Sequence, residues 1–90
     1  MNADQTQADR AATCETMLRT AAREAGAFIS GDGRVHEEVA AALLGIAPGT
    51  LANQRRAGTG PIFYRVSGRP TYRLIDLAEV IERGRCVSGW

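Results

Sequence analysis

Residues 37–58 constrain the fold most, because two short helices are expected there with almost no chain between them. Acidic side chains open Glu37–Leu44, where they suit the positive end of a helix dipole, and Gly45 ends that segment. Pro48 fits the first turn of a second helix, which Gly58 ends. Two short helices joined by three or four residues that include a glycine are typical of a helix–turn–helix unit. The first helix is expected to bury Val39, Ala40, Leu43 and Leu44.

A period-two alternation of side chains follows this unit. It covers residues 62–66 and 71–75 and predicts an antiparallel pair of strands. Tyr64 and Tyr72 are expected on the core face, and a slip of one residue would bury Arg73. The expected register consists of Val66 opposite Tyr72, Arg65 opposite Arg73, and a loop of Gly68, Arg69 and Pro70.

Helices are also expected near both ends of the chain. Residues 8–25 contain no proline or glycine and carry a narrow alanine-rich stripe, which either packs on the same domain or pairs with a second copy. Asp76 and Glu79 match a capping box and predict the start of a last helix. Residues 28–35 fit either a very short hairpin or a plain loop. The stripe comprises Ala11, Cys14, Leu18, Ala21 and Ala25, and the last helix would bury Leu77, Val80 and Ile81.

The 90-residue chain is long enough for one small domain and too short for a doubly wound nucleotide fold or a barrel enzyme. Cys14 and Cys86 cannot form a four-ligand zinc site with the single histidine, so free thiols in a reducing cytoplasm are expected. No apolar run approaches the roughly 18 residues of a membrane span, and residues 1–10 do not look like a secretory signal. No catalytic constellation is recognisable, so neither enzymatic activity nor a cofactor is expected.

The charges are distributed unevenly along the chain. Residues 1–48 carry four arginines and seven acidic residues, whereas residues 49–75 carry five arginines and no acidic residue. Residues 76–90 carry two arginines and three acidic residues. A basic block between acidic segments is expected of a surface that neutralises phosphates, and an arginine-rich solvated face is the alternative.

A further set of features spans the second half of the chain in a fixed order. They are Glu38, Ala40-Ala41, Leu43-Leu44-Gly45-Ile46, Thr50-Leu51, Arg56, Gly58, Gly60-Pro61, the segment Phe63 to Tyr72, and Asp76-Leu77. In this order and spacing, residues 35–85 resemble the winged helix–turn–helix proteins of the excisionase and AlpA group within the MerR-like superfamily. Two positions depart from the group's pattern. His36 replaces the usual Ser or Thr cap, and Gln54 stands where an aromatic residue is frequent, which leaves either less core there or an extra base-reading side chain.

The resemblance implies an α+β, mainly helical, winged helix–turn–helix fold with a two-stranded wing and an extra N-terminal helix. The corresponding organisation is an N-terminal helical extension over residues 1–27, the winged domain over residues 28–85 and a tail over residues 86–90. The implied function is sequence-specific binding of double-stranded DNA at the nucleoid, as a phage or prophage excisionase that directs recombination or as a small transcription regulator. A homodimer or higher oligomer on DNA is expected, and an integrase or another phage protein is a further candidate partner.

Two groups of side chains are expected to contact the DNA. Asn and Gln pair with adenine edges and Arg with guanine edges or phosphate, while arginines of the wing would reach the backbone or the minor groove. If four arginines neutralise phosphates, log K should fall against log salt with a slope of about −3.6 per protomer, from about 0.9 per contact. The candidates are Thr50, Asn53, Gln54, Arg55 and Arg56 on the helix and Arg65, Arg69 and Arg73 on the wing.

A protein-binding module of phage origin is the alternative function, in which the helix at residues 8–25 recruits or inhibits a partner. DNA binding that weakens steeply with salt would favour the first function. Tight, salt-insensitive binding to a protein would favour the second. Trp90 is either a packing anchor for the tail or an exposed partner contact.

Overall fold

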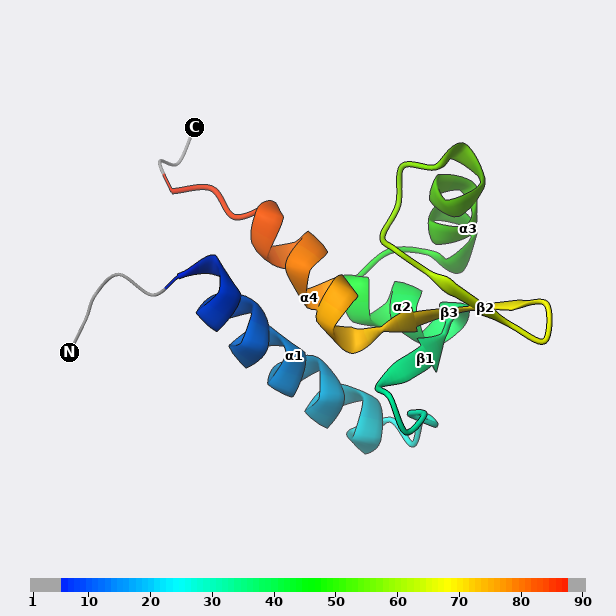
Figure 1. Ribbon diagram of the computed structural model, residues 1–90, viewed down its shortest axis with the longest axis horizontal. Coiled ribbons are helices and arrows are strands. Elements are labelled where there is room, and N and C mark those ends of the chain that lie inside the picture. The colour runs from blue at the N-terminus through cyan, green and yellow to red at the C-terminus, as the bar shows by residue number, and fades with distance from the viewer. Residues whose placement is uncertain (1–5, 88–90) are drawn as a thin grey trace.

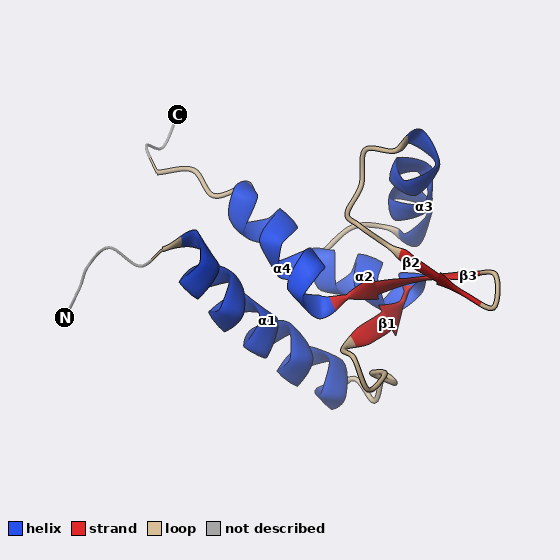
Figure 2. Ribbon diagram, in the orientation of Figure 1, coloured by secondary structure: helices blue, strands red, loops and turns tan. Residues whose placement is uncertain are grey.

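The computed structural model describes residues 6–87 and shows a mainly helical α+β protein, with four helices and one three-stranded antiparallel sheet in this part of the chain (Figures 1 and 2). Trp90 lies outside the described residues. Helices α1 and α4 run side by side, and α3 lies at the opposite end of the molecule, next to the β2–β3 hairpin (Figure 1). The elements are α1 (Gln7–Glu24), β1 (Arg34–His36), α2 (Glu37–Leu44), α3 (Pro48–Ala57), β2 (Tyr64–Val66), β3 (Arg69–Arg73) and α4 (Leu74–Arg83).

The helix α1 packs along α4. Thr6 caps its start, because the Thr6 hydroxyl accepts a hydrogen bond from the backbone N–H of Asp9 at 3.0 Å. Ala11, Leu18 and Ala22 are buried, and the small alanines let the two helices approach closely. Of the expected stripe, Ala11 and Leu18 are buried and Cys14 is partly buried in the same domain, whereas Ala21 and Ala25 are exposed. The packed face of α1 therefore differs from the expected stripe near the end of the helix, where Ala22 is buried instead.

The sheet contains a third strand that the sequence did not predict. Its strand order is β1-β3-β2, so β3 is central. The chain turns tightly before β1, where the N–H of Ser30 donates to the carbonyl of Arg34 at 2.9 Å. Val35 then lies opposite Tyr72, and both side chains are completely buried. The segment at residues 28–35 is thus a turn that leads into a strand of the main sheet.

The register of β2 and β3 differs from the predicted one. Tyr64 lies opposite Thr71 and Val66 lies opposite Arg69, which leaves only Ser67-Gly68 in the turn. Both turn residues have positive φ angles, 52° and 78°, as a two-residue hairpin turn of type I′ requires. This short turn fixes the register. The predicted pairs, Val66 with Tyr72 and Arg65 with Arg73, are wrong.

The change of register also changes which aromatic residue faces the core. Phe63 packs there, with its ring centroid 6.2 Å from that of the buried Tyr72. Tyr64, which was predicted in the core, lies half-buried on the outer face of the sheet. There the guanidinium carbon of Arg73 lies 4.8 Å from the centroid of the Tyr64 ring.

Helix α4 starts earlier than the capping-box match predicts. Strand β3 passes directly into α4, and the N–H of the completely buried Leu74 donates to the carbonyl of Gly33 at 2.8 Å. Asp76 consequently lies inside the first turn, and Arg73 occupies the cap position without a side-chain capping bond. The burial of Leu74 sets the start of the helix, so the capping-box prediction is wrong. The buried residues of α4 are Leu74, Leu77 and Ala78, while Ile81 is 36% exposed.

The helices α2 and α3 have the predicted bounds, and three residues join them. Gly45 and Gly58 end them in the left-handed conformation, with φ angles of 78° and 73°. His36 occupies the cap position of α2 and forms no side-chain capping bond there. In α2 the completely buried residues are Ala40 and Ala41, whereas Val39, Leu43 and Leu44 are only partly buried against the core.

Candidate nucleic-acid interface

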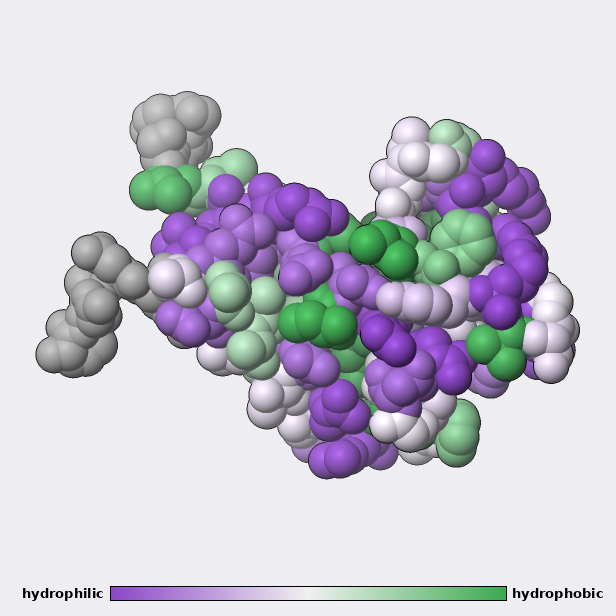
Figure 3. Space-filling view, in the orientation of Figure 1, coloured by the Kyte–Doolittle hydropathy of each residue, from purple (hydrophilic) through white to green (hydrophobic). Residues whose placement is uncertain are grey.

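The exposed side of α3 carries polar side chains. Thr50, Asn53 and Arg56 are exposed, and Nη1 of Arg56 donates to Oδ1 of Asn53 at 3.3 Å. Leu51 is the only residue of α3 that is buried. Amide and guanidinium groups of this kind can bond to base edges in a major groove. Hydrophilic side chains gather over α3 and beside the hairpin (Figure 3).

Gln54 contacts the loop that follows α3. A Cβ atom at Gly60 would lie 3.1 Å from Cβ of Gln54, which shows how closely the two segments approach. The N–H of Thr59 donates to the carbonyl of Gln54 at 3.0 Å. The Gln54 side chain is half-buried and packs beneath this loop, so it is less available than Asn53 to a ligand on the exposed face.

Arg55 forms an ion pair inside the protein. Its Nε donates to Oε2 of Glu37 at 2.7 Å, and its Nη2 donates to Oε1 at 3.1 Å. The hydroxyl of Tyr72 also donates to Oε2 of Glu37, at 2.7 Å. The hydrogen bonds from Arg55 lower the pKa of Glu37, while burial raises the pKa of Tyr72. The structure therefore gives Arg55 a partner within the fold.

Phe63 connects α3 to the hairpin. Its ring centroid lies 5.9 Å from the guanidinium carbon of Arg55 and 5.5 Å from that of Arg65. Both contacts have the geometry of a cation–π interaction. The basic end of α3 and the start of β2 are thus adjacent.

The hairpin presents two exposed arginines on opposite faces. Arg65 lies on the face with Phe63, and its Nη1 donates to the carbonyl of Gly68 at 3.2 Å. Arg69 pairs with Val66 and is exposed, and its side chain forms no hydrogen bond or ion pair with residues 6–87. The tight turn between them holds both side chains near the tip.

Arg73 lies on the outer face of the sheet and has an acidic partner. Its Nη2 lies 3.2 Å from Oδ2 of Asp32, which also binds Nε of Arg34 at 2.8 Å. Hydrogen bonds from Arg34 and Ser30, together with Arg73, hold the pKa of Asp32 well below its ordinary value. Arg73 is therefore partly neutralised and shares its face with Tyr64.

The structure divides the five arginines of the acid-free segment into two sets. Arg56, Arg65 and Arg69 keep exposed guanidinium groups without an acidic partner among residues 6–87, whereas Arg55 and Arg73 are paired. The pairing partners, Glu37 and Asp32, come from the preceding part of the sequence, where only a dipole role and a turn were predicted. Sequence composition alone does not reveal such long-range neutralisation.

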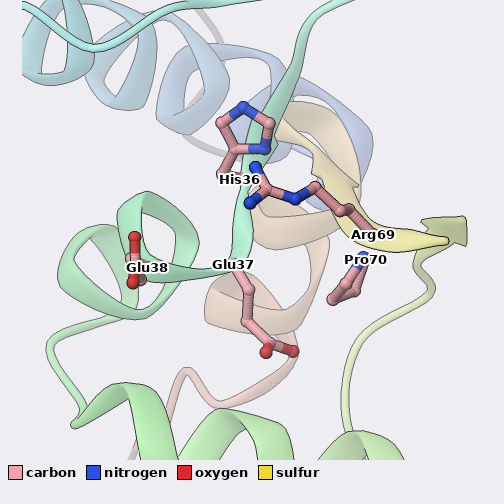
Figure 4. A pocket seen from close by; sticks show the side chains of 5 residues that line it. All are labelled: His36, Glu37, Glu38, Arg69 and Pro70. Carbon is pink, nitrogen blue, oxygen red and sulfur yellow. The ribbon is translucent and has the colours of Figure 1, made fainter. Parts of the chain in front are cut away.

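A shallow cavity of about 220 Å³ lies between the start of α2 and the hairpin (Figure 4). His36, Glu37, Glu38, Arg69 and Pro70 line it. Figure 4 shows the guanidinium of Arg69 beside the His36 ring, while Glu37 points away toward α3. The cavity mixes one basic and two acidic side chains, so it favours no simple anion.

Residues 6–87 offer no group of three or more His, Cys, Asp or Glu side chains that could hold a metal ion. No helix in this part of the chain is long and apolar enough to cross a membrane. The chain matches no known family model, and comparisons with curated proteins and with solved structures give no match either.

Proposed function

We propose that the chain binds double-stranded DNA as a winged helix–turn–helix protein of the excisionase and AlpA kind. In this proposal α3 enters the major groove and the β2–β3 hairpin is the wing. One observation carries it: the acid-free residues 49–75 fold into α3 and the adjacent hairpin, where Phe63 contacts Arg55 of α3 and Arg65 of β2. The helix pair followed by a hairpin and a last helix also agrees with the expected order of elements.

In this proposal, some of the exposed side chains of α3 and the hairpin contact base edges and others contact phosphates. Thr50 and Asn53 are the candidates for base contacts, because they lie exposed on one helix. Arg56, Arg65 and Arg69 are the candidates for backbone contacts, which position the protein without reading sequence.

The arginine pairing revises the expected salt dependence. Arg55 and Arg73 already have acidic partners, so three arginines rather than four are left to neutralise phosphates. With about 0.9 counterion released per contact, the slope of log K against log salt becomes about −2.7 per protomer.

The proposed output is recombination directionality or regulation of transcription, with the protein located at the nucleoid. One short helix and one wing cover few base pairs, so the protein is proposed to act as a dimer or higher oligomer on repeated sites, with an integrase as a candidate partner. Ala11, Leu18 and Ala22 are already packed in the fold, so self-association would use another surface.

Selection of binding sites from random duplexes, followed by footprinting, tests the proposal. Asn53→Ala should lose about 1–3 kcal/mol on the selected site and little on a scrambled duplex, because it removes a base contact. Thr20→Ala, at an exposed position of α1, is the control and should change neither affinity. The proposal is overturned if the chain binds no duplex, or if Asn53→Ala weakens both duplexes equally.

The alternative is a protein-binding module that uses α1. Its support is an apolar groove of about 260 Å³ between α1 and α4, which contains Cys14, the exposed Met17 and Ile81. Salt-insensitive capture of a protein partner, lost in Met17→Glu, would favour this function over DNA binding.

A further inference from the structure

Few side chains attach α3 to the rest of the protein. Leu51 is its only buried residue and lies in the first half of the helix. The second half carries Arg55, whose guanidinium is the group that reaches back to α2. The orientation of α3 therefore depends on what holds Arg55.

The carboxylate of Glu37 holds the Arg55 side chain in place. Glu37 is the first residue of α2 and directly follows β1. Its two oxygens accept two hydrogen bonds from Arg55, at 2.7 and 3.1 Å, and a third from Tyr72 at 2.7 Å. The side chains of Arg55 and Glu37 are only 14% and 16% exposed, so water screens their charge-assisted bonds less than at the surface. Glu37 thus joins α2, α3 and β3 at one point.

The hairpin is part of the same cluster through Phe63. The guanidinium groups of Arg55 and Arg65 both lie over the Phe63 ring, which also packs near Tyr72. Any rotation of α3 that moves Arg55 would therefore disturb the packing of the Phe63 ring, which directly precedes β2.

We infer that Glu37 is a positioning residue that fixes α3 relative to the hairpin and thereby sets which DNA sequence the chain prefers. Its consequence for specificity rests on the proposed function. Base contacts from α3 and phosphate contacts from the hairpin must form at the same time. If α3 samples several orientations, the binding-competent one is populated only in part, so specific affinity falls while phosphate attraction persists.

Two neighbouring glutamates provide a matched test. Glu37→Gln and Glu38→Gln each remove one negative charge from the first turn of α2, so they change the long-range field alike. The Glu38 side chain is exposed and forms no hydrogen bond or ion pair with residues 6–87. In Glu37→Gln, amide hydrogens of α3 should exchange about tenfold faster, and those of α1 and α4 less than about twofold faster. In Glu38→Gln all three helices should keep the exchange rates of the parent.

Binding to a selected and a scrambled duplex provides the second readout. The ratio of the two affinities should fall about fivefold in Glu37→Gln and stay unchanged in Glu38→Gln. The inference is overturned if α3 exchanges no faster in Glu37→Gln, if both variants behave alike, or if α3 loosens while the ratio is kept. If the parent binds no duplex, the proposed function fails, and the exchange rates alone decide whether Glu37 positions α3.

Two further variants keep the test decisive if Glu37→Gln does not fold. Arg55→Lys retains the charge and loses the fork that binds both carboxylate oxygens. Tyr72→Phe removes only the third hydrogen bond. Arg55→Lys should speed exchange in α3 more than Tyr72→Phe does, and unchanged α3 protection in Arg55→Lys would overturn the inference.

Discussion

The α1–α4 pair and the α3–hairpin pair are held by different interactions. The first buries a continuous apolar seam that includes Leu18, Leu74 and Leu77, with one ion pair between Arg10 and Glu82 at its side. The second has Leu51 as the only buried residue of α3 and depends on the Arg55–Glu37 pair. Apolar burial is insensitive to pH, whereas a carboxylate can be protonated, so the two regions should respond to different perturbations.

The largest effect is expected from the apolar seam. Leu77→Ala should lower the free energy of unfolding by about 2–5 kcal/mol, because it leaves a cavity under a completely buried side chain. Chemical denaturation followed by circular dichroism measures this loss. Ile81→Ala, one turn further along α4 at a 36% exposed position, should cost less than about 1 kcal/mol. Equal losses of unfolding free energy in the two variants would contradict the claim that apolar burial between α1 and α4 stabilises this region.

A smaller loss is expected from the α3 attachment. Arg55→Ala should lower the free energy of unfolding by about 1–3 kcal/mol, because it leaves the Glu37 carboxylate mostly buried without its main partner. The neighbouring Arg56→Ala should stay within about 0.5 kcal/mol of the parent, since that side chain is exposed. The same denaturation measurement compares them, and a reversed order would contradict the distinction between paired and exposed arginines.

The pH dependence separates the two regions further. The pKa of Glu37 is lowered in the folded state, so its stabilising contribution is present above the unfolded value of about 4.3 and is lost as pH falls through the folded pKa. Amides of α3 should therefore lose protection on acidification before those of α1. In Glu37→Gln the amides of α3 and α1 should no longer differ in the pH at which they lose protection. Simultaneous loss of protection in α3 and α1 of the parent would contradict a role of the Glu37 carboxylate in this pH dependence.

Glycine and proline residues at the helix ends made α2 and α3 predictable from the sequence. Gly45, Pro48 and Gly58 act through backbone conformation alone, so they place the ends of α2 and α3 without knowledge of the tertiary structure. The start of α4 was missed because the burial of Leu74 overrides the capping match at Asp76.

The hairpin register could not be read from alternation, because Phe63 and Tyr64 are adjacent aromatics and either could face the core. The choice depends on the positive φ of Ser67, which no sequence rule favours, and on pairing with β1. Pro70 also favoured a loop, yet it fits in β3 because β1 ends at His36, opposite Thr71.

The candidate site was predictable as a segment and not as a set of free side chains. The absence of acids from residues 49–75 indicates a basic segment, and the structure leaves Arg56, Arg65 and Arg69 exposed, with Arg65 and Arg69 on opposite faces of the hairpin. The neutralisation of Arg55 depends on Glu37, 18 positions earlier in the chain. Such a contact arises from tertiary packing and has no local signature.

The salt dependence of duplex binding tests the central claim most directly. The parent should show a slope of log K against log salt of about −2.7 per protomer, and Arg69→Ala should flatten it to about −1.8. Arg73→Ala, the matched comparison, should flatten the slope less than Arg69→Ala does, because Arg73 shares the Asp32 carboxylate with Arg34 and is partly neutralised. A parental slope near zero, or equal flattening by the two variants, would contradict the assignment of Arg56, Arg65 and Arg69 as the phosphate-binding arginines.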